Sequence, residues 1–249
     1  EINPYKSERI KVIDLFSGCG GLSEGLLQVG DSRDFLPDGL LPQRSSEGER
    51  PPAQCYDILA HVEWEAPMVR TLRANLKQRW GCTEDEALRH VVHFDIQETE
   101  ALLRGCSSQT DQELLNKFSS NHADMLKGGL DLLVDGQQVD LIVGGPPCQA
   151  YSIAGRAQDQ NGMRDDYRNY LFESFAKVVE HYQPRLFVFE NVEGLLSAKP
   201  GGRRATEMIY QHFLKIGYQI WSPEKLPRAL LDLSDFGVPQ RRKRVIIIG

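Results

Sequence analysis

Cys148 is the residue whose surroundings most strongly suggest chemistry. It follows VDLIVGGPP at residues 139–147, where an apolar run ends in two glycines and two prolines. The apolar run predicts a buried strand, and the prolines restrict the backbone around them, so the loop that leads to Cys148 is stiff. A thiol on a rigid loop at the tip of a strand is placed as a nucleophile would be. The alternative is a small apolar core residue, which would need no stiffened loop.

A second group of residues could assist such a nucleophile. Glu190 ends the apolar run 186–189, so we expect it to be partly desolvated and able to share a proton with a ring nitrogen. The basic run at 241–244 supplies arginines, and arginine near a thiol favours its ionised form. A thiol that attacks a ring carbon, while an acid relieves charge on the ring, would convert an unreactive aromatic ring into a reactive enamine.

Three further residues predict a pocket for adenosine. Glu63 could accept hydrogen bonds from ribose hydroxyls, Trp64 could stack on adenine, and Asp95 could accept from the adenine amino group. The glycine-rich stretch 17–21 lets a ligand approach the backbone, but it is not GxGxxG, so no pyrophosphate site is implied. S-adenosylmethionine fits this description. The alternatives are a surface carboxylate for Glu63, a core aromatic for Trp64 and a helix N-cap for Asp95. Asp14 could instead tie down the glycine turn.

The elements that must position these residues alternate between strand and helix patterns. This alternation predicts an α/β fold with a doubly wound, mostly parallel sheet, Rossmann-like, over a single domain at 1–249. We expect inserted loops at 31–55 and 97–138, the second with a helix around 110–127. Asp135-Gly136 could be a hairpin turn or part of a loop. The predicted strands are 11–16, 56–62, 90–94, 139–143, 186–189 and 245–248, and the other predicted helices are 22–29, one beginning at Pro67, 167–182 and 203–216.

Ligands of such a sheet bind beyond the carboxyl ends of its strands. Each of the first five predicted strands is followed by a residue of interest, namely Gly18, Glu63, Asp95, Cys148 and Glu190. We therefore expect these five positions to line one crevice.

The composition is that of an ordinary globular protein, with 41% hydrophobic and 26% charged residues. No apolar stretch approaches the ~18 residues of a membrane span, and the first ten residues do not resemble a signal peptide. The five cysteines are odd in number and form no CxxC pair, so neither a disulfide framework nor a metal site is expected. The net charge of −6 opposes polyanion binding, and only the local arginines suggest phosphate contacts.

Taken together, the motifs make the chain resemble the DNA (cytosine-5) methyltransferases over almost its full length. Their order and spacing match as well as their content. The matching segments are DLFSGCGG (14–21), VEW (62–64), FDI (94–96), GGPPCQAYSIAGR (144–156), RNYLF (168–172), FENVEGL (189–195) and GVPQRRKRVIIIG (237–249).

The resemblance implies a mechanism and a set of roles. Cys148 would attack carbon 6 of a cytosine flipped out of double-stranded DNA. Glu190 would hydrogen-bond ring nitrogen 3 and the amino group, Arg244 the carbonyl oxygen, and Asn191 would position the cysteine loop. Carbon 5 would take the methyl group of S-adenosylmethionine, and loss of its proton would expel the cysteine. The residues implied to hold the cofactor are Phe16, Gly18, Gly20, Glu63, Trp64, Asp95 and Leu171, and those implied to contact or order DNA are Ser152, Arg156, Gln240 and Arg242.

Members of the family continue past the last matching segment into a variable target-recognition region and a final motif. We therefore expect either a catalytic region without that C-terminal part or one half of a split enzyme with a second chain. Two other functions stay open: methylation of RNA by the same constellation, and a cofactor-binding or scaffolding subunit, against which the intact PPCQ and ENV argue. The resemblance implies a cytoplasmic or nucleoid-associated protein in a bacterium and a nuclear one in a eukaryote.

Overall fold

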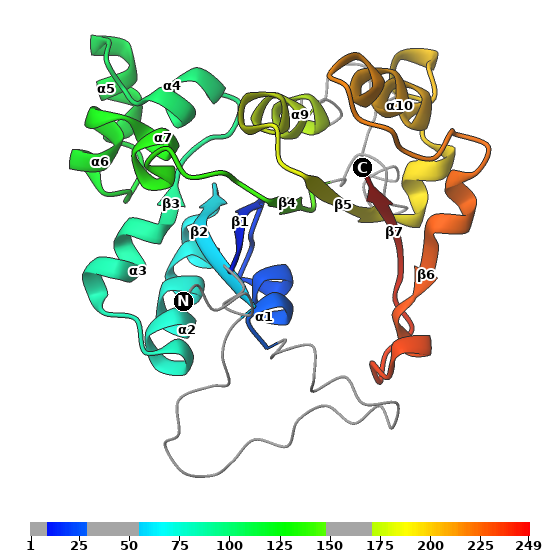
Figure 1. Cartoon of the computed structure of the whole chain (residues 1–249), viewed down its shortest axis with the longest axis horizontal. Helices are drawn as coiled ribbons and strands as arrows, with labels where there is room; N and C mark the ends of the chain where they lie inside the picture. The colour runs from blue at the N-terminus through cyan, green and yellow to red at the C-terminus, as the bar shows by residue number, and fades with distance from the viewer. Residues whose placement is uncertain (1–8, 29–54, 148–170) are drawn as a thin grey trace, which may run out of the picture.

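A computed structural model describes residues 9–28, 55–147 and 171–249, and within them the strands form one seven-stranded sheet (Figure 1). Its order is β3-β2-β1-β4-β5-β7-β6. The first five strands are parallel, whereas β7 runs antiparallel to both β5 and β6. The strands are β1 (Ile10–Leu15), β2 (Tyr56–Glu63), β3 (Val91–His93), β4 (Leu141–Gly144), β5 (Leu186–Val192), β6 (Leu230–Asp232) and β7 (Lys243–Ile248).

Helices cover both faces of the sheet, as the doubly wound prediction requires. The apolar side of α2 packs over one face, and α4, α7, α9 and α10 bury their apolar residues over the other (Figure 1). Phe175, Phe187, Phe189 and Phe213 meet edge-on or stacked in the core between β5, α9 and α10. The helices are α1 (Gly21–Gln28), α2 (Ala66–Trp80), α3 (Glu84–His90), α4 (Thr99–Arg104), α5 (Gln109–Leu115), α6 (His122–Lys127), α7 (Gly129–Val134), α9 (Leu171–Tyr182) and α10 (Ala205–Lys215).

The expected loop at 97–138, with one helix around 110–127, is wrong. This segment folds into the four short helices α4 to α7, which bury Leu102, Leu115 and Leu130 in the main core. Ser108 starts α5 with a capping box, and the Asn121 side chain accepts the first amides of α6. Because α5 ends at Leu115 and the N-cap Asn121 begins α6, residues 109–127 form two short helices rather than one.

Other described boundaries differ only slightly from those expected, with two additions, the helix α3 and the strand β6. The short strand β6 forms an antiparallel edge beside β7, which apolar periodicity did not indicate. Asp135 and Gly136 form neither a hairpin nor an open loop, because Asp135 is left-handed (φ 51°) and ends α7. The predicted insertion 31–55 lies outside the described residues except for Cys55.

The strand order decides where a site can form. β1 and β4 are neighbours at the centre of the sheet. From β1 the chain adds β2 and β3 toward one edge, and from β4 it adds β5 toward the opposite edge. Such a reversal leaves a crevice at the carboxyl ends of the strands, where ligands of doubly wound sheets bind. Among the described residues, no helix is long and apolar enough to cross a membrane.

Candidate active site

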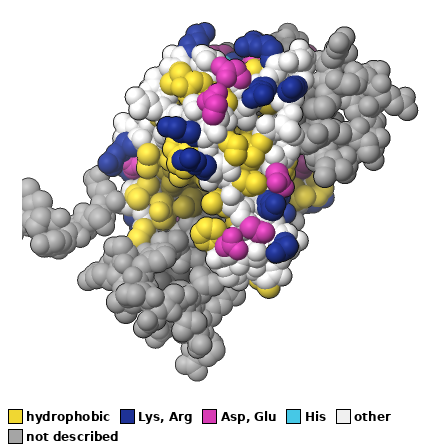
Figure 2. All heavy atoms as spheres, turned by 90° about the vertical axis from the view of Figure 1, so that its right-hand side faces the viewer, with side chains coloured by type: hydrophobic (Ala, Val, Ile, Leu, Met, Phe, Trp, Pro, Cys, Tyr) yellow, Lys and Arg dark blue, Asp and Glu magenta, His cyan; other side chains and the backbone are white. Residues whose placement is uncertain are grey.

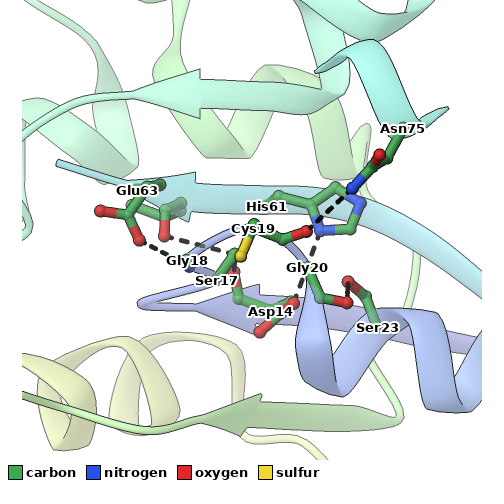
Figure 3. A network of polar contacts seen from close by, with 10 residues as sticks. Asp14, Ser17, Gly18, Cys19, Gly20, Ser23, His61, Glu63 and Asn75 are labelled. Atoms are coloured by element: carbon green, nitrogen blue, oxygen red, sulfur yellow. Dashed lines mark hydrogen bonds and ion pairs between the residues drawn. The ribbon is translucent and has the colours of Figure 1, made fainter. Parts of the chain in front are cut away.

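Glu63, at the end of β2, ties the glycine turn to its own strand (Figure 3). Its Oε2 accepts a hydrogen bond from the Gly18 amide at 2.6 Å, and its Oε1 accepts from the amides of Trp64 and Glu65 at 2.9 and 2.7 Å. The side chain is buried, so it is not the surface carboxylate of the alternative interpretation. A carboxylate offers about four lone-pair sites, and three are used here. One acceptor site, on Oε2, is left for a ligand.

The turn after β1 is shaped by backbone conformations that favour glycine. Gly18 has φ of 57°, in the left-handed region where glycine is least strained. A Cβ on Gly20 would stand 2.7 Å from Leu72 Cδ1, so its lack of a side chain lets the turn approach α2 closely. The Ser17 hydroxyl donates to the Asp14 carbonyl at 2.7 Å and closes the turn. The two glycines therefore shape the turn rather than line the cavity.

A cavity of about 340 Å³ opens at the carboxyl ends of β1, β2, β3 and β4. This volume falls within the roughly 300–1,000 Å³ typical of ligand pockets. The carboxylates of Glu63 and Asp95 lie in its wall, and Phe16, Ile96 and Leu171 supply apolar surface. Two hydrogen-bond acceptors among flat apolar walls suit a ligand with hydroxyls and an aromatic ring, such as a nucleoside.

The structure supports neither of the alternative interpretations, a helix N-cap for Asp95 and a core aromatic for Trp64. Asp95 is not a helix N-cap, since α4 begins only at Thr99. Its Oδ1 accepts the Gln97 amide at 3.0 Å, which orients the carboxylate. Trp64 is not a core aromatic, because 48% of its surface is exposed. Its indole lines the cavity, and the ring of Phe118 meets it edge-on at 6.1 Å.

Glu190 and Arg244 form an ion pair beside this cavity. The two residues come from β5 and β7, and Glu190 Oε1 lies 2.5 Å from Arg244 Nε. Both side chains are largely buried, so the charges face one another with little water between them. Gly145, in the cavity wall, faces the same carboxylate, because a Cβ there would stand 2.7 Å from Glu190 Oε2. The pair thus adjoins the loop that leads to Cys148.

Asn191, the neighbour of Glu190 in β5, connects this strand to the loop that follows β4. Its side-chain amide donates to the Pro146 carbonyl at 3.4 Å, a long hydrogen bond, and its Oδ1 accepts the Val192 amide at 2.9 Å. The side chain is 3% exposed, and Pro146 is two residues before Cys148. An anchored carbonyl so close to the cysteine restricts where the loop can go.

The remaining residues of interest are only partly covered by the structure. Cys148, Ser152 and Arg156 lie outside the described residues. Gln240 and Arg242 are exposed in the turn that joins η6 (Leu233–Phe236) to β7, where the Arg242 amide donates to Asp232 Oδ1 at 3.2 Å. The basic run does not act as one group, since Lys243 pairs with Glu193 at 3.6 Å while Arg244 turns toward Glu190.

Asp14 does not tie down the turn through its side chain. Its carboxylate is fully buried and faces His61 Nδ1 at 3.5 Å across β1 and β2 (Figure 3). Neither of its oxygens accepts a hydrogen bond within the part of the chain that the structure describes. Within that same part, no three His, Cys, Asp or Glu side chains converge as metal ligands would.

The sequence analysis missed several residues that shape the site. Met68, Ile96 and Gln97 line the cavity, and Ile96 and Gln97 could have been found because they directly follow Asp95. His93 and Phe118 lie behind Trp64, and no pattern in the sequence connects them.

Solved structures with the same arrangement are methyltransferases. A prophage-encoded protein of E. coli, assigned as a DNA modification methyltransferase, has 23% identity and a TM-score of 0.53 over 96% of this chain and 46% of its own. The Entamoeba histolytica methyltransferase EhMeth has 14% identity and a TM-score of 0.50 over 97% of this chain and 53% of its own. At this identity the likeness concerns the fold, and it confirms the predicted α/β methyltransferase fold.

The family follows from sequence comparison. Residues 10–249 match the family described as C-5 cytosine-specific DNA methylase, and the chain belongs to that family. It is 35% identical to the Type II methyltransferase M.Bpa9945I of Bacillus paralicheniformis over 96% of this chain, and 40% identical to M1.HphI of Haemophilus parahaemolyticus over 95%. The chain spans about half the length of these relatives, 53% and 45% respectively.

Proposed function

We propose that the protein transfers a methyl group from S-adenosylmethionine to carbon 5 of cytosine in DNA. The observation that carries the proposal is the Glu190–Arg244 pair, which lies beside Gly145 in the wall of a nucleoside-sized cavity. Family membership supports the same reaction. A carboxylate and a guanidinium held together match the edge of a cytosine, which presents an amino group, a ring nitrogen and a carbonyl oxygen.

The residues around the cavity fit S-adenosylmethionine. The single open acceptor site of Glu63 suits one ribose hydroxyl, Asp95 suits the adenine amino group, and Trp64 and Leu171 offer apolar surface to the ring. Phe16 lies in the same wall, whereas Gly18 and Gly20 act through the turn. When bound, this cofactor supplies an electrophilic methyl group. The chain's own residues must therefore make cytosine nucleophilic.

Glu190 and Arg244 act on the base in this proposal. Glu190 hydrogen-bonds ring nitrogen 3 and the amino group, and Arg244 donates to the carbonyl oxygen. Cys148 forms a bond to carbon 6 as electron density moves onto the ring, and a proton on Glu190 relieves the charge at nitrogen 3. After carbon 5 has bonded to the methyl group, its proton passes to solvent. The electron pair left behind restores the double bond between carbons 5 and 6 as the carbon–sulfur bond breaks and its electrons return to the Cys148 sulfur. Asn191 holds the Pro146 carbonyl and so limits the positions open to the cysteine loop.

The reaction needs the base outside its helix, since a thiol cannot reach carbon 6 in a stacked pair. DNA contacts in this chain are proposed for Ser152, Arg156, Gln240 and Arg242. Among the described residues on the face that carries α10 and β6, Lys and Arg side chains are interspersed with acidic and apolar ones and form no continuous basic surface (Figure 2). Such a mixed surface supports a small number of phosphate contacts.

The reaction class can be tested by supplying the protein with S-adenosylmethionine tritiated in its methyl group and either duplex DNA or tRNA. We expect the label in DNA, and 5-methylcytosine as the labelled nucleoside after digestion. Label in tRNA alone would favour the RNA reaction, and no label in either would favour a binding subunit.

Replacing Glu63 with glutamine should weaken cofactor binding by about 1–3 kcal/mol, because the charge-assisted contact with the ribose is lost. The amide oxygen can still accept from Trp64 and Glu65, but the NH₂ group cannot accept from Gly18. Calorimetry with S-adenosylhomocysteine would measure the change. Glu180→Gln is the control, since Glu180 is exposed on α9 and is not among the residues that line the cavity. Unchanged affinity in Glu63→Gln would move the ribose contact elsewhere.

Duplex DNA should bind residues 1–249 weakly and without sequence preference, because phosphate contacts position a protein without specifying a sequence. Replacing Arg242 with alanine should make the slope of log K against log salt concentration shallower by about one, where K is the DNA-binding constant, because one phosphate contact contributes about that much. Fluorescence anisotropy at several salt concentrations would measure both slopes. Lys127→Ala is the control, as Lys127 is exposed on α6, far from β7 (Figure 1). Equal slopes in the wild type and Arg242→Ala would remove Arg242 from the contact.

A further inference from the structure

His93, the last residue of β3, is bound at both ring nitrogens although only 6% of its surface is exposed. The Ser119 amide donates to Nδ1 at 2.9 Å, the Ser119 hydroxyl lies at the same distance from Nδ1, and Nε2 lies 2.9 Å from the Trp64 carbonyl oxygen. An amide N–H can only donate, so Nδ1 must be the acceptor. Nε2 then carries the proton and donates to Trp64. Its two neighbours therefore select one neutral tautomer of the ring.

These two bonds join parts of the chain that are far apart in sequence. Trp64 lines the cavity, and Ser119 belongs to residues 116–120, which connect α5 to α6. Between them, the ring of Phe118 meets Trp64 edge-on at 6.1 Å and His93 edge-on at 5.1 Å. Arg73 of α2 donates to the Ser119 carbonyl at 2.9 Å and secures the segment from the other side. The segment 116–120 is thus docked directly behind the exposed indole.

We propose that His93 is a positioning residue for the cofactor pocket, and that its neutral form holds Trp64 and the segment 116–120 together so that the indole is a fixed wall for the adenine. The inference rests on the proposed function in one respect, the identity of the ligand. Half of the Trp64 surface is exposed, so its own burial does not hold the indole rigidly. Its backbone carbonyl and the Phe118 ring supply the restraint instead.

The proposal has a consequence that depends on pH. Protonation places an N–H on Nδ1, which breaks the hydrogen bond from the Ser119 N–H and sets these two donors against each other. The Ser119 hydroxyl, which already accepts from Arg73, is then the acceptor left beside Nδ1. Desolvation, with smaller contributions from Arg73 and Arg70 of α2, lowers the pKa of His93, while the Trp64 carbonyl and Glu65 oppose this shift. The neutral form is therefore favoured in the folded protein at neutral pH. Cofactor affinity should fall as the pH drops through the pKa of His93, below its usual range.

Three His93 variants separate the two bonds. His93→Gln places an uncharged amide donor where Nε2 lies, loses the acceptor for Ser119 and does not titrate, so its affinity for S-adenosylhomocysteine should be modestly lower than that of the wild type and nearly the same at both pH values. His93→Asn places an acceptor near Nδ1 but loses the donor to Trp64. His93→Phe keeps the ring and loses both bonds, and its affinity should fall about 5- to 10-fold, the effect of one to two hydrogen bonds acting on the wall.

Calorimetry with S-adenosylhomocysteine at about pH 7.5 and about pH 4.5, the second of which lies below the usual histidine range, tests the proposal. We expect wild-type affinity to fall several-fold between the two, and His93→Gln to change little. His181→Gln is the matched control, since His181 pairs with Asp131 about three turns along α9 from the cavity residue Leu171. That variant should retain the wild-type dependence on pH.

The possible results distinguish this inference from the proposed function. The same fall in affinity in the wild type and in His93→Gln would overturn the positioning role alone, because the titrating group would then lie elsewhere. Full affinity in His93→Phe at both pH values would do the same. A wild-type protein that binds no S-adenosylhomocysteine at either pH would overturn the proposed function, and the inference with it.

Discussion

Replacing Cys148 with serine should abolish methyl transfer, lowering the rate by at least about four orders of magnitude, while cofactor binding stays nearly unchanged. An alcohol is a far weaker nucleophile than a thiolate at neutral pH, so the bond to carbon 6 would not form. Tritium transfer to duplex DNA measures the first effect, and calorimetry with S-adenosylhomocysteine measures the second. Activity that survives in this variant would mean that the reaction proceeds without a cysteine adduct.

DNA containing 5-fluorocytosine should trap the unmodified protein through the same residue. Fluorine cannot leave carbon 5 as a proton does, so the carbon–sulfur bond persists and can be located by peptide mapping. The other cysteines supply controls: Cys19 is exposed, and burial raises the pKa of Cys106 to about 11, which makes its thiol a poor nucleophile at neutral pH. An adduct on Cys19 would refute the assignment to Cys148.

Replacing Glu190 with glutamine should lower the rate of methyl transfer by about 10²- to 10⁴-fold, the usual contribution of a positioned acid. Glutamine cannot supply the proton that relieves charge at ring nitrogen 3. The change also leaves the largely buried Arg244 without its counter-charge. Single-turnover kinetics would separate this effect on chemistry from any effect on binding of DNA or cofactor.

Glu193→Gln is the matched control for this variant. Glu193 begins the short helix η3 (Glu193–Ser197) directly after β5 and pairs with Lys243 of β7 at 3.6 Å, and both side chains are about half exposed. An exposed ion pair contributes little, about 0–1 kcal/mol, so this variant should retain near-normal activity. Equal losses in the two variants would attribute the effect to the β5–β7 contact rather than to a proton held by Glu190.

Much of the fold could be predicted because its signals are local. Each of the five parallel strands is an apolar run, so their positions were found to within a few residues. The alternation with helices implied a doubly wound sheet, whose strand ends meet at one edge. That rule alone predicted that Glu63 and Asp95 would line the same cavity although they are 32 residues apart in the numbering. The motifs PPCQ and ENV identified the family without reference to structure.

The predictions that failed concern segments whose local signals conflict or are weak. Residues 97–138 carry N-cap residues inside an apolar pattern, and only packing on the core decides that four short helices form there. The strand β6 is three residues long, so it has too few positions to show a period, and pairing with β7 defines it.

The sequence by itself determined the family, the order of the strands and helices, and the residue types available for chemistry. The tertiary structure decided which of those residues meet. Glu63 accepts an amide 45 positions away, Arg244 rather than Lys243 faces Glu190, and His93 bonds to both Trp64 and Ser119. These contacts depend on strand order and register, which set the distance between residues remote in the chain. The periodicity of apolar residues shows only which face of a strand or helix a residue occupies. It cannot show which residue of another strand or helix lies opposite.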